Sequence, residues 1–200
     1  MLNPPVDSED NARFKRAIRA AEELFKRVGF RAVTMEMVAR EANVAKATLY
    51  NHFKNKDDLY LAVCARMARL LRGAVEQALA RPGAPLDARL AAAVIAKHRM
   101  VFTLVRGSAH AAELFSYKDA MAGEVFAELD AAILTLLADS IAADAQLSPK
   151  AERLARALYL GGSELASRAA TTAEMEHEIG DFAAVHLAGA RALAGKEKGI

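Results

Sequence analysis

Apolar residues recur along most of the chain at intervals of three and four positions, the spacing that places them on one face of an α-helix. The N-terminal stripe comprises Phe14, Ala17, Ile18, Ala21, Leu24, Phe25 and Val28. Gly29 follows this stripe, and glycine commonly comes directly after the last turn of a helix. We therefore expect the first helix to run from near Asp10 to Val28. Its opposite face is either solvated or in contact with phosphate, and we favour solvation except near the helix start; this face carries Arg13, Lys15, Arg16 and Arg19.

The same criteria predict about nine helices in all. The second and third are short and cover 34–41 and 45–53. The fourth follows Asn55, its expected N-cap, and ends at the Arg81–Pro85 break. Beyond Pro85 we expect helices over 86–105, 108–117, 120–143, 149–170 and 174–194. Ser148 is the expected N-cap of the helix over 149–170, with proline at its first position.

Composition agrees with a helical chain. Hydrophobic residues make up 54% of the sequence, aromatic residues only 6%, and prolines number five. Because β-branched and aromatic residues favour strands, this balance favours an all-α fold. We expect two domains, 1–55 and 56–200, with a disordered arm over 1–9.

The region from Thr34 to Leu59 carries the spacing of a helix-turn-helix. Ala39 is small enough for a second helix to cross closely, and Asn43 is one of the few side chains that tolerates positive φ in the turn. Val44 and Leu49 then point inward between the two helices. An ordinary surface αα-hairpin remains an alternative, because any two short helices need a turn.

The helix over 45–53 combines polar and cationic side chains with apolar anchors. Val44, Leu49 and Phe53 form the apolar side, and no acidic residue lies within the helix. Its polar members are Lys46, Thr48, Tyr50, Asn51, His52 and, just beyond, Lys54. This arrangement suits the negatively charged major groove of DNA.

The string VTMEMVAREANVAKATLYNHFKNKDDLYLAV resembles the DNA-binding domain of the tetracycline-repressor (TetR) family of bacterial regulators. Its most specific part is TLYNHFKNKDDL, similar to the family's Leu-Tyr-x-His-Phe, Lys-x-Lys and acidic pair. Two residues depart from the family pattern: Asn43 replaces the usual glycine, and Ala45 replaces a capping Ser or Thr. The second change weakens the helix start by up to about 1 kcal/mol.

We assign base contacts to Lys46, Ala47 and Thr48, near the N-terminal end of the third helix. The resemblance implies phosphate contacts for Tyr50 and His52, with added charge from Lys54 or Lys56. Buried packing is the alternative for Tyr50 and His52. Thr34 is the expected N-cap of the second helix, whose N-terminus also favours a phosphate. The full set of predicted DNA-binding residues is Thr34, Ala45, Lys46, Ala47, Thr48, Tyr50, Asn51, His52, Lys54 and Lys56.

Net charge is only +2, but its distribution is uneven. From Asn11 to Lys54 ten basic residues face four acidic ones, whereas from Asp119 to Ala194 five basic residues face twelve acidic ones. A basic N-terminal segment and an acidic C-terminal segment indicate polyanion binding at one end only.

The resemblance also implies a small-molecule pocket and a four-helix dimer interface in the C-terminal domain. The pocket candidates suit an apolar or aromatic effector; they are His98, Phe102, Arg106, His110, Glu113, Phe115, Tyr117, Phe126 and Tyr159. The dimer candidates lie at helical spacing on the last two helices, which can instead bury against their own domain. They are Ala155, Gly162, Ala166, Ile179, Phe182, Ala183, His186, Leu187 and Ala190.

Several functional classes lack support in the sequence. It contains no Gly-rich phosphate loop, HExxH or GxSxG motif, and its five histidines show no paired ligand spacing, so we expect no enzyme, metal or cofactor. Cys64 is the only cysteine, which excludes an intrachain disulfide. We expect a cytoplasmic protein, because the sequence shows neither a signal-peptide pattern nor a long apolar run. The resemblance implies that it is bacterial and nucleoid-associated when bound to DNA.

These observations predict a homodimeric regulator that binds a double-stranded operator and represses until a small effector releases it. Two alternatives remain. One is a DNA-binding regulator controlled by a protein partner and lacking a pocket. The other is a helical sensor or enzyme with a vestigial helix-turn-helix.

Overall fold

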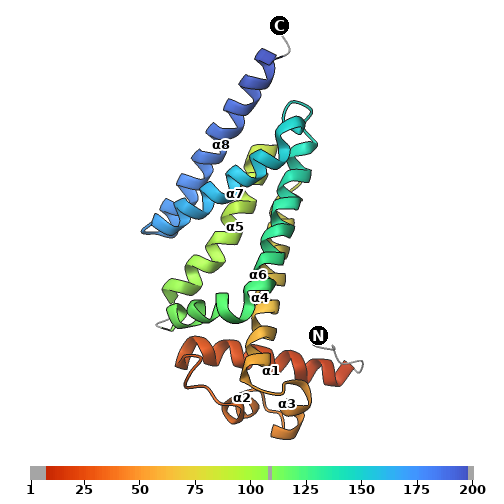
Figure 1. Cartoon of the computed structure of the whole chain (residues 1–200), viewed down its shortest axis with the longest axis vertical. Helices are drawn as coiled ribbons and strands as arrows, with labels where there is room; N and C mark the ends of the chain where they lie inside the picture. Colours follow the sequence, from red (N-terminus) through yellow and green to blue (C-terminus); the bar gives the residue numbers. More distant parts are fainter. Residues whose placement is uncertain (1–7, 108–109, 198–200) are drawn as a thin grey trace. The chain divides into compact units, whose positions relative to one another are not determined.

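A computed structural model describes the backbone of residues 8–107 and 110–197, with side chains over 9–103, 110 and 121–195. The helices are α1 (Ser8–Val28), α2 (Met35–Glu41), α3 (Lys46–His52), α4 (Lys56–Leu79), α5 (Leu86–Gly107), α6 (Ala111–Ala142), α7 (Ala151–Arg168) and α8 (Thr172–Glu197), with a 3-10 turn at Ser148–Lys150 (Figure 1). The described residues contain no strand, and the predicted all-α fold is confirmed. The chain forms two compact units, one over 1–68 and 104–126 and the other over 69–103 and 127–200.

In the first unit, α1 packs against the short helices α2 and α3 (Figure 1). Its apolar stripe is buried as its spacing predicts, with Ala17 and Ala21 fully enclosed. Gly29 ends the helix at φ 90°, and its N–H donates to the Phe25 carbonyl at 3.1 Å. The rings of Phe25 in α1, Phe30 after it and Tyr60 in α4 pack against one another, with centroids 5.1–6.2 Å apart. This cluster joins α1 and α4 in one core.

The turn between α2 and α3 has the conformation that its sequence predicts. Asn43 is the one non-glycine residue with positive φ in the described chain, at 52°. The backbone N–H of Val44 reaches back to the Ala39 carbonyl at 3.0 Å, which satisfies a free carbonyl at the end of α2. Ala39 and Leu49 are buried, so the two helices approach closely.

Side chains cap α2 and α4 where the sequence predicts caps. Thr34 accepts the Met37 N–H at 3.2 Å, and Asn55 accepts the Asp58 N–H at 2.8 Å. Ala45 offers no side-chain cap to α3. The first N–H groups of α3 therefore receive no hydrogen bond from a capping side chain.

In the second unit, α7 and α8 form a helical hairpin (Figure 1). A capping box begins α8: Thr171 accepts the Glu174 N–H at 3.1 Å, and the Glu174 carboxylate accepts the Ala170 and Thr171 N–H groups at 2.7 and 3.3 Å. Farther along α8, the Arg191 guanidinium binds both Asp87 oxygens at 2.7 and 2.9 Å and Asp144 at 3.2 Å. This ion pair network ties together the start of α5, the segment after α6 and the end of α8.

Three predicted boundaries differ in the structure. The two helices expected over 108–117 and 120–143 correspond to α6, in which a kink with non-helical backbone at Ala122 (φ −124°, ψ 16°) separates two helical stretches. The prediction of Ser148 as an N-cap is wrong, because Ser148 is the first residue of the 3-10 turn and α7 begins at Ala151. The first helix begins at Ser8 rather than near Asp10, and residues 1–7 of the expected arm lie outside the described residues.

The interruption in α6 has a local cause. Gly123 follows Ala122 directly, and glycine has the lowest helix propensity after proline. No described helix is both long enough and apolar enough to cross a membrane.

Candidate nucleic-acid interface

The exposed side of α3 is polar and basic. Leu49 and Phe53 are fully buried and fix the helix against the core of the first unit. On the opposite side every one of Ala45, Lys46, Ala47, Tyr50, Asn51 and Lys54 is exposed, and Thr48 is half-buried. Seven predicted DNA-binding residues thus lie together on or beside one short helix.

Lys46, the first residue of α3, forms an ion pair with Glu36 in the first turn of α2. The Lys46 ammonium also lies 5.8 Å from the centre of the Tyr50 ring. The hydrogen bond with Glu36 raises the pKa of Lys46, and the same bond lowers the pKa of Glu36. Both side chains are more than half exposed, at 58% and 55%, so solvent weakens their attraction.

His52 is packed rather than free. Its side chain is only 11% exposed, and Nε2 lies 2.9 Å from an Asp10 carboxylate oxygen on α1. The imidazole ring meets Phe14 edge to face at 5.6 Å. A phosphate contact by His52 requires Nε2 to leave Asp10 or Nδ1 to reach the DNA.

The two predicted lysines after α3 have different environments. Lys54 is exposed, with its backbone N–H donating to Asp58 at 3.1 Å. The Lys56 ammonium donates to the carbonyl oxygens of Phe30 and Arg31 at 2.8 and 3.1 Å and lies 4.5 Å over the Phe30 ring. Lys56 therefore holds the segment after α1, whereas Lys54 has its charge available. Thr34 is exposed and serves as the cap of α2.

Among the predicted effector residues, His98 and Tyr159 are both buried in the second unit and lie in one polar cluster, whose Asp130 side chain is 47% exposed. The Tyr159 hydroxyl donates to Asp130 and accepts from Lys97. Burial, followed by the hydrogen bond to Asp130, raises the pKa of Tyr159. His98 Nε2 lies 3.4 Å from the Ser163 hydroxyl, and burial lowers the pKa of His98 to about 4.

The other effector candidates are spread over both units or lie outside the described residues. Phe102 and His110 are half-buried, and Phe126 packs against the core of α1 to α4. Arg106, Glu113, Phe115 and Tyr117 have side chains outside the described residues.

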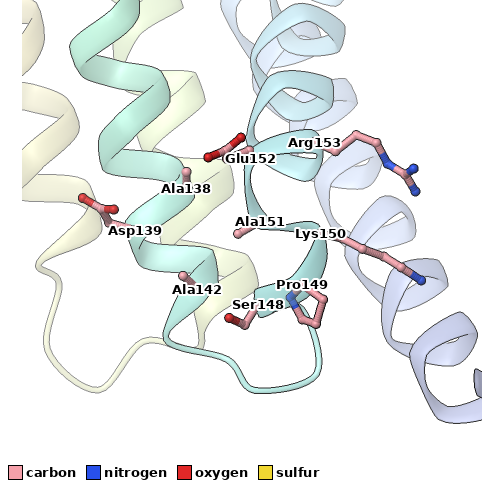
Figure 2. Close-up of a pocket in the computed structure, with 9 residues that line it drawn as sticks. All are labelled: Ala138, Asp139, Ala142, Ser148, Pro149, Lys150, Ala151, Glu152 and Arg153. Atoms are coloured by element: carbon pink, nitrogen blue, oxygen red, sulfur yellow. The ribbon is translucent and has the colours of Figure 1, made fainter. Parts of the chain in front are cut away.

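A cavity of about 480 Å³ lies between α6 and the start of α7, and none of these candidates is among its lining residues (Figure 2). Its polar lining includes Asp139, Ser148, Lys150 and Glu152, and the Lys150 and Arg153 side chains extend away from α6 in Figure 2. The sequence offered no motif for this cavity, because its lining comes from two helices and the turn that joins them.

Most predicted dimer residues are buried within their own unit. Ala155, Ile179, Ala183, Leu187 and Ala190 are at most 8% exposed. Gly162 is buried beside Val94, which an added Cβ would approach to 2.3 Å. Phe182 covers Gly161 and stacks on His186 at 5.2 Å, and Ala166 is half-buried.

A different set of apolar residues is exposed on this hairpin. Leu160 on α7 and Val185 and Leu193 on α8 are 55%, 74% and 58% exposed. Sequence periodicity placed Leu193 in the apolar stripe of the last helix but did not select Leu160 or Val185, because it does not reveal which apolar positions face the partner helix.

Comparison with known proteins finds a family match in the N-terminal part of the chain. Residues 17–63 match the family model described as bacterial regulatory proteins, tetR family. The HTH-type transcriptional regulator YhgD of Bacillus subtilis is 30% identical over 93 residues, which are 46% of this chain and 44% of that protein. The HTH-type transcriptional activator FasR of Mycolicibacterium smegmatis is 45% identical over 60 residues, 30% of this chain and 27% of that one.

The chain thus spans less than half the length of these curated relatives. A TetR-like transcriptional regulator from Rhodococcus sp. RHA1 shares the fold at a TM-score of 0.60 and 24% identity, over 88% of this chain and 96% of that one. These similar proteins are regulators rather than enzymes.

Proposed function

We propose that this protein is a DNA-binding transcriptional regulator of the tetR family, because residues 17–63 match the model of that family of bacterial regulatory proteins. The observation that carries the proposal is the exposed polar face of α3, held by Leu49 and Phe53 and preceded by the positive-φ turn at Asn43. A helix so presented fits the major groove, with its N-terminal residues toward base edges. The unequal charge of the two ends of the chain supports the same assignment.

Within residues 1–55, the proposed base contacts are Lys46, Ala47 and Thr48, and the proposed phosphate contacts are Tyr50, Asn51 and Lys54. Lys46 and Tyr50 are more than 40% exposed, which supports their part in this set. His52 and Lys56 have partners within the protein, so we propose that their main role is to position α3 and α4, respectively.

We further propose that residues 56–200 form the dimerisation and effector-binding part, and that the dimer is a repressor released by a small molecule. Two recognition helices would then enter successive major grooves about 34–36 Å apart. The polar cluster around the buried residues His98 and Tyr159 supports an effector site, because a few polar groups among apolar residues are typical of ligand pockets. Helix α4 contributes residues to both units, which supports its role in transmitting the change.

The test is fluorescence anisotropy of the full chain on labelled duplexes, at two salt concentrations. Fragments selected from genomic DNA supply the specific duplex, and a scrambled duplex of equal length supplies the control. We expect the selected duplex to bind at least about a thousandfold more tightly, with affinity falling steeply as salt rises. Equal, weak binding of every fragment by both the untreated and the ligand-stripped protein would refute the proposal.

A pair of lysine variants separates base contacts from phosphate contacts. Lys54→Ala should weaken binding to both duplexes alike and reduce the salt slope by about one. Lys46→Ala should instead change which bases are preferred at one position of each half-site. Unchanged specificity and affinity in Lys46→Ala would remove Lys46 from the recognition set.

A further inference from the structure

The start of α3 has two features that disfavour a helix N-terminus. Ala45 provides no side-chain cap, and Lys46 places a positive charge at the positive end of the helix dipole. The neighbouring Glu36 carboxylate, from the first turn of α2, neutralises that charge through the ion pair with Lys46. The pair therefore joins the two helices at the point where the proposed base contacts begin.

Surface exposure makes this pair a weak contributor to folding. Lys46 and Glu36 keep 58% and 55% of their side-chain surface in water, and such pairs typically contribute little to stability. The position of the pair is more informative than its strength. A carboxylate beside the recognition helix repels phosphate, which is a cost for a DNA-binding surface unless it has a compensating role.

The ammonium group of lysine has three N–H donors, and Glu36 needs only one of them. Lys46 can therefore donate to the neutral acceptors O6 and N7 of guanine while it remains paired with Glu36. A phosphate contact differs, because the phosphate and the Glu36 carboxylate are both anions and repel each other. The pair thus permits a base contact and disfavours a phosphate contact by the same side chain.

From this geometry, and resting on the DNA-binding function proposed above, we propose that Glu36 is a specificity-determining positioning residue. It holds the Lys46 ammonium at the α2–α3 junction, where base edges are within reach, and keeps it from the phosphate backbone. Lys46 then makes no contact with non-specific DNA, whereas it binds the guanine of a site that has guanine at the right position. Glu36 acts through Lys46 and needs no contact with DNA of its own.

The test compares the wild type with Glu36→Gln, which keeps the shape of the side chain and removes its charge. Affinity for the scrambled duplex should rise roughly three- to tenfold, and its salt slope should steepen by about one phosphate contact. Affinity for the selected duplex should rise less, so the ratio of specific to non-specific affinity falls. Glu41→Gln is the matched control, because Glu41 lies on the same helix, is exposed and pairs with Arg27 at 3.3 Å.

A double-mutant cycle with Lys46→Ala separates this role from a general charge effect or support of the helix. In the Lys46→Ala background, Glu36→Gln should leave the specificity ratio unchanged. Thermal unfolding of each variant checks that α3 keeps its fold. The proposal is overturned if Glu36→Gln alters both duplexes by the same factor, or if its effect survives without Lys46. Failure of the wild type to bind any DNA would instead refute the proposed function itself.

Discussion

At the scale of single residues, the turn before α3 shows how a departure from a family pattern can still satisfy the backbone. The turn requires positive φ, and Asn43 supplies it at 52° where glycine is usual. Asn is one of the few L-residues for which this conformation is inexpensive, since its short side chain bonds locally. The side chain is exposed, so its contribution lies in backbone conformation rather than packing.

Asn43→Ala should lower the free energy of unfolding by about 1 kcal/mol, because alanine has no local bond to offset left-handed backbone. Asn43→Gly should keep or slightly raise stability, because glycine has no Cβ and adopts left-handed backbone without steric cost. Urea unfolding of the three proteins measures both differences. Equal stability of the Ala and Gly variants would show that the turn relaxes out of positive φ.

Neighbouring residues also decide what the lysines near α3 can do. Lys46, Lys54 and Lys56 look equivalent in the sequence, yet one is paired with Glu36, one is exposed, and one binds two carbonyl oxygens after α1. Charge alone therefore does not identify a DNA contact. The availability of each ammonium group depends on the loop or helix that the fold places beside it.

At the scale of elements, the second unit buries a histidine on α5. His98 is only 8% exposed and lies near Gly162 of α7, where the absence of a side chain lets the two helices approach. Burial, and secondarily the Lys97 charge, hold the pKa of His98 at about 4. The folded protein therefore keeps this imidazole neutral at pH values where the unfolded chain binds a proton.

This difference predicts a pH-dependent loss of stability. Because the pKa is lowered from 6.5 to about 4, the free energy of unfolding should fall as the pH drops through that interval, by up to about 1.4 kcal/mol per pH unit. His98→Gln should flatten this dependence. His177→Gln is the control, since His177 lies 78% exposed on α8 and should leave the dependence nearly unchanged. Parallel curves for the wild type and His98→Gln would contradict the assignment.

At the scale of the whole molecule, the proposed dimer depends on the apolar side chains that α7 and α8 leave exposed. Leu160, Val185 and Leu193 are each more than half exposed, whereas the stripe that pattern alone selected is mostly buried inside the unit. Exposed large apolar residues at the surface of a helical hairpin are typical of protein interfaces. We therefore expect a second copy of the chain to cover them.

Val185→Asp should raise the dimer dissociation constant roughly tenfold or more, because it buries an unpaired charge in the interface. Analytical ultracentrifugation measures that change, and operator affinity should fall with it. Ala184→Asp, at an adjacent exposed position of α8, is the control for added charge. A dimer unaffected by Val185→Asp would place the interface elsewhere.

The sequence by itself determined the helical class, the caps at Thr34 and Asn55, the turn at Asn43 and the anchors Leu49 and Phe53. Each follows from local rules, since helix periodicity, capping and positive φ depend on residues within a few positions of one another. These rules also bring the exposed members of the candidate interface together on α3.

Only the tertiary structure decided which stripe of α8 is buried, which lysine is paired, and that Lys97, Asp130 and Tyr159 meet. The contacts among Lys97, Asp130 and Tyr159 join residues 29 to 62 positions apart. All three outcomes depend on how helices pack rather than on the pattern within any one helix. The cavity beside Ser148 has the same origin, since a turn and two helices enclose it. Local chemistry thus specifies the elements, and packing between them specifies which side chains remain available to DNA, to a ligand or to a second subunit.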